Sequence, residues 1–171
     1  MLVRPALSSD VPQIAAVHVR SWQAAYRGHM PDSLLDALDP IQRAAWWDKL
    51  VVDPNVTVVV ALEGVALIGF SSLSACRDDD ACPGTSEIAT LYVDPASWRS
   101  GCGKSLLEAV VDVARQRGFR QLSLWVLATN LVARAFYESQ GFSPDGRSKT
   151  DSRLGAPLHE VRYRRELLTE T

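Results

Sequence analysis

Residues 86–118 decide the fold, and they read SEIATLYVDPASWRSGCGKSLLEAVVDVARQRG. The first eight residues predict a β-strand, and the second half has apolar side chains at helical spacing before Gly118 ends the helix. Gly101 and Gly103 stand where this helix begins, so a ligand can approach the backbone closely. The free N–H groups and the helix dipole there attract an anion. The segment predicts a phosphate site, and the alternative is a helix start where small residues merely fit.

The same turn is not a nucleotide-binding P-loop. That motif needs a glycine where this chain has Trp98, ahead of Gly103-Lys104. The strand predicted at 121–127 also ends without the aspartate that holds magnesium in such enzymes. These two departures exclude a kinase or an ATPase of that type.

Strands and helices lie on both sides of this unit. Upstream, the sequence predicts a strand at residues 2–6 and helices at 11–21, 31–38 and 39–50. A hairpin follows, made of strands at 55–62 and 65–75. Downstream, it predicts a strand at residues 121–127, a helix at 130–140, a strand that begins at 142 and a last strand at 158–167. Asp10 and Gln13 have the spacing of a capping box before the first helix. This order predicts one α/β domain over residues 1–171, built around a single mixed sheet.

Two segments are expected to be mobile loops, residues 77–85 and residues 143–157. The first contains three aspartates that we expect to be solvated, Asp78, Asp79 and Asp80. Three tryptophans are core candidates, Trp46, Trp47 and Trp125.

The bulk composition is that of an ordinary globular chain. Of 171 residues, 47% are hydrophobic and 22% are charged, and the net charge is −2. This balance argues against nucleic-acid binding, which needs a basic surface. Cys76, Cys82 and Cys102 form no disulfide framework and no zinc spacing, so we expect a cytoplasmic protein without a metal. We also expect no membrane span and no signal peptide.

The phosphate turn and a second motif together resemble the GNAT superfamily of N-acetyltransferases. That family carries Gln/Arg-x-x-Gly-x-Gly/Ala and, further along, Asn-x-x-Ala-x-x-x-Tyr and Gly-Phe. The matching residues here are Gly101, Gly103, Asn130, Ala133, Tyr137 and Gly141-Phe142. Trp98 stands in the Gln/Arg position, which puts a side-chain contact from that position in doubt.

The resemblance implies a GNAT-like acyl-CoA N-acyltransferase fold (α+β), in which a mixed, mostly antiparallel sheet is flanked by helices. It implies acetyl-CoA as co-substrate, bound by Leu91, Tyr92, Val93, Arg99, Ser100, Gly101, Cys102, Gly103, Lys104, Ser105, Asn130 and Ala133. The backbones of Leu91 and Val93 would pair with the pantetheine amides like an added strand. The strands ending at Val93 and Leu127 are expected to separate and admit the pantetheine arm.

Several of these residues have an alternative role. Asn130 is a pantetheine contact, the cap of its helix, or both. Arg99 and Lys104 meet phosphates or are surface charges. Cys102 has no partner base, so we do not expect it to be a nucleophile.

Acetylation of an amine needs a base for the protonated nitrogen, a donor for the oxyanion and an acid for the leaving sulfur. By resemblance, Tyr137 lies beside the thioester sulfur as the acid; the alternative is a core aromatic packed with Phe136. Glu87 is the candidate base, directly or through water. The alternative for Glu87 is an exposed strand carboxylate.

His18, Trp22 and Tyr26 recur every four residues and share one face if their helix continues. In the family this region covers the acceptor pocket, so Trp22 and Tyr26 are candidate contacts to a small-molecule or peptide amine. Core packing is the stronger interpretation, because aromatic stripes at this spacing are usually core. The rival function is a non-catalytic domain that binds acetyl-CoA as a sensor, and a homodimer is left open.

Overall fold

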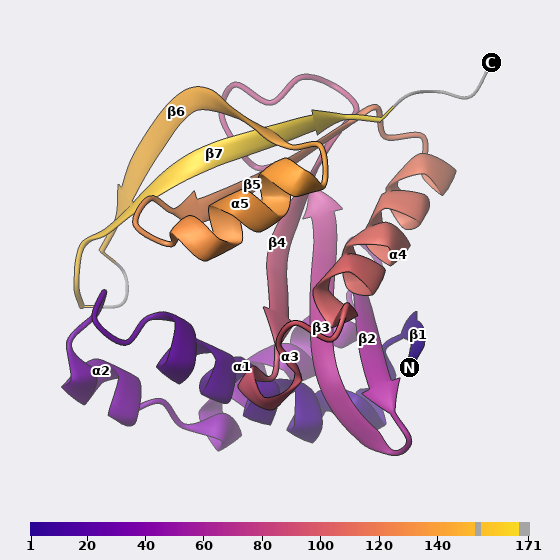
Figure 1. Ribbon diagram of the computed structural model, residues 1–171. Coiled ribbons are helices and arrows are strands. Elements are labelled where there is room, and N and C mark those ends of the chain that lie inside the picture. Colours follow the sequence, from indigo (N-terminus) through magenta and orange to yellow (C-terminus); the bar gives the residue numbers. More distant parts are fainter. Residues whose placement is uncertain (153–154, 168–171) are drawn as a thin grey trace.

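The computed structural model describes residues 1–152 and 155–167 as strands and helices of one sheet-centred fold (Figure 1). The strands are β1 (Leu2–Pro5), β2 (Thr57–Glu63), β3 (Ala66–Ala75), β4 (Thr85–Val93), β5 (Gln121–Leu127), β6 (Ser143–Asp151) and β7 (Leu158–Glu166). The helices are α1 (Val11–Ala25), α2 (Asp32–Asp36), α3 (Pro40–Val51), α4 (Cys102–Gln116) and α5 (Leu131–Ser139), with short 3₁₀ turns at Ser8–Asp10 and Pro95–Ser97. Within these residues no helix is both long and apolar enough to cross a bilayer.

The seven strands form one sheet in the order β1-β2-β3-β4-β5-β7-β6. β4 and β5 are parallel, and every other neighbouring pair is antiparallel. The mixed, mostly antiparallel sheet and the β2–β3 hairpin are therefore confirmed. The parallel pair matters for function, because α4 connects its two strands and begins at the predicted phosphate turn.

The two faces of the sheet bury two separate layers of helices. Along β2, Val58 and Val60 point to one face and pack in the same cluster as Trp47 of α3. Val59 points to the other face and packs in the cluster of Leu106 of α4. This alternation is the two-residue period of a strand covered on both sides. Helices α1 to α3 thus lie on one face, and α4 and α5 on the other (Figure 1).

The first helix begins at Val11 as predicted, but its cap and its C-terminal end differ from the prediction. α1 extends beyond Ser21, so the aromatic segment that follows is helical. The carboxylate of Asp10 accepts from the N–H of Leu7 at 2.8 Å, and Gln13 Oε1 accepts from the N–H of Leu67 at 2.9 Å. The capping-box prediction was wrong, because both side chains bind partners outside the helix.

The strand expected from residue 142 is confirmed as β6, whereas the loop expected at 143–157 was wrong over most of its length. Residues 143–151 form β6, which pairs antiparallel with β7 through an irregularity between Pro144 and Ser148. Nearly all of β6 is exposed, so it has no apolar alternation to announce a strand. Residues 153–154 of that prediction lie outside the described residues. The loop expected at 77–85 is confirmed over residues 77–84, because Thr85 already belongs to β4, and its mobility stays a prediction.

The predicted tryptophan core is correct in part. Trp47 is fully buried, whereas Trp46 is 44% exposed. Consecutive residues of a helix point about 100° apart, so α3 cannot bury both rings against one sheet. Trp125 is half-buried on β5.

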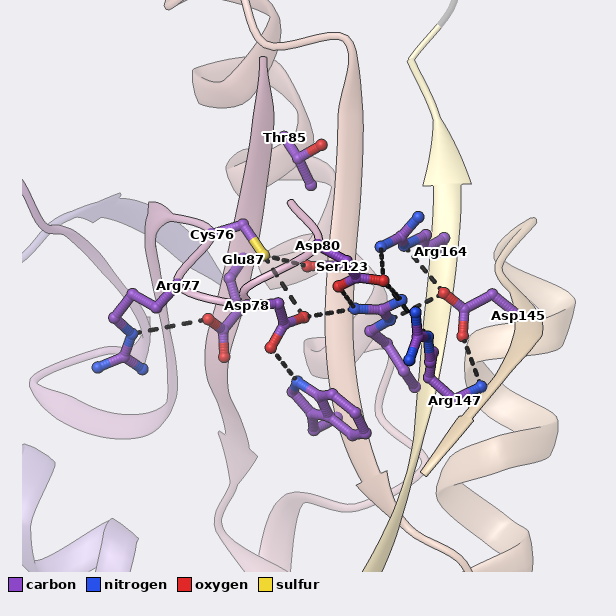
Figure 2. Close-up of polar contacts among 12 residues, drawn as sticks. Cys76, Arg77, Asp78, Asp80, Thr85, Glu87, Ser123, Asp145, Arg147 and Arg164 are labelled. Carbon is purple, nitrogen blue, oxygen red and sulfur yellow. Dashed lines mark hydrogen bonds and ion pairs between the residues drawn. The ribbon is translucent and has the colours of Figure 1, made fainter. Parts of the chain in front are cut away.

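The aspartates of the 77–85 loop are bound to arginine rather than solvated (Figure 2). Arg162 of β7 is 2% exposed and donates to Asp78 at 2.9 Å and to Asp80 at 2.6 and 2.8 Å. Its Nε donates to Asp145 of β6 at 2.8 Å. Asp79, the third member of this predicted trio, is exposed, as expected. The charges hold the loop against β6 and β7.

Candidate active site

β4 and β5 pair over a short stretch and then separate. The parallel ladder joins Thr85–Glu87 to Gln121–Ser123, although β4 continues to Val93 and β5 to Leu127. The predicted separation is confirmed. Beyond Glu87, the described part of the chain provides no strand partner on this edge of β4, and we call this space the β4–β5 gap.

A β-bulge in β4 lies beside this gap. Ser72 of β3 faces Thr90 and Leu73 faces Ile88, so Ala89 is the extra residue. Ala89 is exposed, although the residues on both sides of it in β4 are buried. A bulge twists and re-aims the strand that carries it. Here it directs the second half of β4 away from β5.

The bulged strand presents backbone polar groups to the gap. Asp94 N–H donates to the carbonyl of Ile68 in the β3 direction at 2.8 Å. In an antiparallel ladder the backbone N–H and C=O groups of successive residues point alternately to the two sides of the strand. Those of Val93 and Leu91 therefore point away from β3, toward the gap. These are the two residues whose backbones are predicted to meet pantetheine, and the geometry of Leu91 fits that role.

The carbonyl of Val93 already has donors within the protein. The indole N–H of Trp98 donates to it at 2.8 Å, and the hydroxyl of Ser21 in α1 donates at 2.9 Å. Trp98, the departure from the family motif, therefore closes the turn back onto β4. A ligand amide that donates to this carbonyl would have to share it with the Trp98 indole and the Ser21 hydroxyl, or displace one of them.

The turn before α4 has the geometry of an anion site. Arg99 and Gly101 have left-handed backbones, with φ of 64° and 87°. The first backbone bond that closes α4 runs from the N–H of Ser105 to the carbonyl of Gly101 at 3.1 Å. The N–H groups of the residues between them, including Gly103, thus have no intrahelical partner.

The side chains of this turn have different surroundings. Ser100 donates to the carbonyl of Ser97 at 2.7 Å, and Arg99 and Lys104 are exposed. Cys102 is buried, and burial raises the pKa of its thiol to about 11. The thiol stays protonated at neutral pH, which supports the expectation that Cys102 is not a nucleophile.

Tyr137 is the one fully buried side chain of α5. Its ring lies 5.2 Å from that of Phe136 and 5.9 Å from that of Phe142, centroid to centroid. Asn130 Oδ1 accepts from the N–H of Ala133 at 3.1 Å, so the helix-cap role of Asn130 is confirmed. Its contact with pantetheine stays a prediction.

Tyrosines from both faces of the sheet approach one another at the gap. Burial raises the pKa of Tyr137, and the nearby Tyr92 raises it further. Burial also raises the pKa of Tyr92 to about 12, and that of Tyr26, which lies near both other tyrosines. Tyr92 and Tyr26 belong to the α1 face, whereas Tyr137 packs on the α4 face. The hydroxyls are protonated at neutral pH and can donate.

Glu87 is placed at the last paired residue before the gap, opposite Ser123. It is 8% exposed, which makes the exposed-carboxylate alternative wrong. Arg77 from the adjoining loop lies 3.7 Å from it, between Nε and Oε2 (Figure 2). The structure therefore gives Glu87 a buried position at the edge of the gap with a cation beside it.

His18, Trp22 and Tyr26 share one face of α1, as expected for a continuing helix. Burial lowers the pKa of His18 to about 3, and its Nδ1 accepts from the indole of Trp47 at 3.0 Å. His18 is therefore a neutral core residue and no base. Trp22 and Tyr26 are half-buried, with ring centroids 4.9 Å apart, and they pack on Leu127. Both the core role and an acceptor contact remain compatible with this position.

Two contacts of this region were not predicted from the sequence. Glu160 of β7 lies opposite Leu127 and is close enough to raise the pKa of Tyr26 and Tyr92. Arg20 of α1 pairs with Asp94, which joins α1 to the phosphate turn. No local pattern announces either contact, because the partners are far apart in the chain.

Known proteins resemble this chain in sequence and in architecture. The model of the acetyltransferase (GNAT) family matches residues 17–142. YuaI of Bacillus subtilis, an uncharacterised N-acetyltransferase, is 30% identical over 162 residues, which are 93% of this chain and 89% of YuaI. The structure of the PaiA N-acetyltransferase of Thermoplasma acidophilum in complex with coenzyme A has a TM-score of 0.80 at 19% identity, and covers 96% of this chain and 98% of its own. That of the acetyltransferase yncA of Salmonella typhimurium with acetyl-CoA has a TM-score of 0.74 at 22% identity, with coverage of 100% and 96%.

The family match covers most of the chain, and the two structural likenesses show the same fold over nearly its full length. The separated parallel strands, the β4 bulge and the glycine turn lie within the matched residues. The chain belongs to the GNAT family of acetyltransferases and is an acetyl-CoA-dependent N-acetyltransferase.

Proposed function

We propose that the chain transfers the acetyl group of acetyl-CoA directly to a primary amine of a small molecule or peptide, with Tyr137 as acid and Glu87 as base. The observation that carries this proposal is the β4–β5 gap, because groups from both faces of the sheet reach it. Glu87 and Tyr92 come from the α1 face, and Tyr137 comes from the α4 face. A base and an acid can thus act from opposite sides of one acetyl group.

The coenzyme is proposed to bind along the same gap. The free N–H groups at the start of α4 suit a pyrophosphate, which gains from the helix dipole as well. The backbone of Leu91 would pair with an amide of the pantetheine arm. The relatives solved with coenzyme A and with acetyl-CoA support this ligand for the fold.

The proposed chemistry forms one C–N bond and breaks one C–S bond. An alkyl ammonium, with a pKa of about 10.4, first gives a proton through water to Glu87. The neutral nitrogen attacks the thioester carbonyl carbon, and the tetrahedral species collapses as the sulfur leaves. The hydroxyl proton of Tyr137 passes to that sulfur, so free thiol is released. The nitrogen gives up its second proton as the amide forms, and this proton returns the Tyr137 phenolate to the hydroxyl form. Tyr137 can hold this proton at neutral pH because its pKa is raised.

A thiol-release assay with a panel of amines tests the reaction class. We expect release of thiol only when an amine is present, with acetyl amide formed in equal amount. Tight binding of acetyl-CoA without release by any amine would contradict the proposal and favour the sensor function.

Gly103→Asp is expected to weaken acetyl-CoA binding at least tenfold, about 1.4 kcal/mol. The substitution adds negative charge where the proposed pyrophosphate meets the start of α4. Gly103→Ala is the matched control, because an added Cβ would lie 3.6 Å from the ring of Phe136, an ordinary contact. Calorimetry compares the three proteins. Unchanged affinity for acetyl-CoA in a folded Gly103→Asp variant would show that the pyrophosphate does not bind at this turn.

Glu87→Gln is expected to lower kcat/KM about tenfold at neutral pH. This is below the usual range of about 10²–10⁴ for a positioned base, because water relays the proton. The deficit should shrink as pH rises, since more acceptor is then already neutral. Glu108→Gln on α4, which removes another carboxylate in an ion pair, is the control. A deficit that persists unchanged at high pH would assign Glu87 a structural role.

A further inference from the structure

An ammonium group of the chain itself is bound on the face of the sheet that α1 covers. Nζ of Lys149 in β6 lies 4.2 Å from the centroid of the Trp125 ring. The same nitrogen lies 3.6 Å from Oε2 of Glu160. An aromatic face and a carboxylate together are a favourable setting for a cation. Lys149 is 41% exposed, so its ammonium lies at the surface and is able to leave this position.

This cation position lies along β5 from the proposed base. Ser123 pairs with Glu87, and Trp125 and Leu127 follow on the same face of β5. Glu160 is the cross-strand partner of Leu127. With a rise of about 3.3 Å per residue, Trp125 and Leu127 lie about 7 and about 13 Å beyond the pair that contains Glu87.

The position is open to solvent at Lys149 and adjoins the part of the α1 face that borders the gap. Leu127 packs in one cluster with Trp22 and Tyr26 of the α1 face. Glu160 is the cross-strand partner of Leu127, and after burial its charge is a further cause that raises the pKa of Tyr26 and Tyr92. A molecule that reaches from Glu87 along this face therefore meets Trp125 and then Glu160.

The aromatic ring of this position is held in place. The indole N–H of Trp125 donates to Asp78 Oδ1 at 3.1 Å. Asp78 is itself bound by Arg162 at 2.9 Å, and the carboxylates around Arg162 offset its charge. A fixed ring costs little ordering entropy when a cation binds to it.

We propose that Trp125 and Glu160 form a subsite for a second ammonium group on the acceptor, and that Lys149 occupies this subsite until such an acceptor binds. The inference rests on the proposed function and narrows the acceptor to amines with a second positive charge. By the strand register, that charge lies about 7–13 Å along β5 from the pair that contains the proposed base Glu87. Aliphatic diamines are the simplest members of this class.

The test compares 1,6-diaminohexane with hexylamine, which has the same length and lacks the second ammonium. The wild type is expected to favour the diamine in kcat/KM about tenfold, the size of one partly desolvated cation contact. Glu160→Gln should remove this preference through the KM for the diamine and leave hexylamine unchanged. Lys149→Met should lower the KM for the diamine alone, because the internal competitor is gone. Asp112→Asn on α4, which breaks an exposed ion pair with Arg115, should change neither.

The outcomes separate the inference from the function on which it rests. If the wild type acetylates both amines equally, or if Glu160→Gln affects both equally, Lys149 and Glu160 are a structural pair only and the inference is overturned. If the wild type acetylates neither amine, the proposed reaction fails for alkyl amines. Calorimetry then still decides on the subsite, because Lys149→Met should bind the diamine more tightly than Lys149→Met/Glu160→Gln. Equal binding by these two variants would overturn the inference.

Discussion

Tyr137→Phe is expected to lower kcat about a hundredfold while acetyl-CoA binds with unchanged affinity. The ring keeps its contacts with Phe136 and Phe142, so the fold and the pocket wall survive. Only the hydroxyl is lost, and with it the proposed proton donor to sulfur. Positioned acids contribute about 10²–10⁴-fold, and a thiolate is already a fair leaving group, which favours the lower end.

The measurement is steady-state thiol release with calorimetry of acetyl-CoA on the same protein. A hydroxyl that acts only in the transition state lowers kcat and kcat/KM together. Tyr163→Phe is the matched control, because its hydroxyl also joins α5, through Arg134 at 3.0 Å and Glu138 at 2.7 Å. Wild-type turnover in Tyr137→Phe would mean that Tyr137 only lines the site and that water protonates the leaving sulfur.

Arg162→Met is expected to destabilise the fold by about 3 kcal/mol, the low end for breaking a buried ion pair from one side. The arginine is 2% exposed and its removal leaves three carboxylates without their shared cation. Equilibrium unfolding in urea measures the loss. Arg147→Met is the control, because Arg147 approaches Asp80 as well but is 65% exposed, so its stability should stay near wild type. A loss in Arg147→Met equal to that in Arg162→Met would mean that burial of the cation is irrelevant.

The same cluster predicts how the loss depends on pH. Hydrogen bonds from Arg162 hold the pKa of Asp80 well below its usual value. Burial opposes ionisation of Asp78, but hydrogen bonds from Arg162 and Trp125 outweigh it and lower that pKa too. A lowered pKa stabilises the fold above the unfolded value of about 3.9, and this stability is lost as pH falls below it. The difference between wild type and Arg162→Met should therefore be full at neutral pH and shrink in acid; a constant difference would contradict the ionic account.

The sequence predicts the middle of the chain well, because each of its patterns lies entirely within a short segment. The glycine turn, the α4 periodicity and the β2–β3 hairpin each depend on residues close in the chain, and the structure places all three as expected. Tyr137 and Asn130 were found in the same way, since their spacing lies on one helix. The separation of β4 from β5 followed from the family pattern together with the breaks at Asp94-Pro95 and Thr129-Asn130.

The features that sequence could not supply are contacts between distant segments. Arg162 reaches Asp78 and Asp80 across more than eighty positions, so three consecutive aspartates gave the signal of a solvated loop. A strand was expected from residue 142, but its extent to Asp151 was not, because pairing with β7 defines β6 and its own exposed residues carry no periodicity. The opposite error arose at Asp10, where a helix-start pattern was present but the side chain binds the preceding segment. Glu160 was overlooked because its role depends on its neighbours across the gap.

The two outermost strands of the sheet oppose growth of the sheet from one molecule to the next. At one side, β1 has only four residues and ends in Pro5, which lacks a donor. At the other side, β6 contains Pro144, breaks its register before Ser148, and is charged and exposed along its length. Short, bulged, proline-containing and charged edges are poor templates for an incoming strand. Association through continuous intermolecular β-pairing is thus disfavoured, so a homodimer of this chain would form through helices or loops, and the folded state is protected from edge-to-edge aggregation.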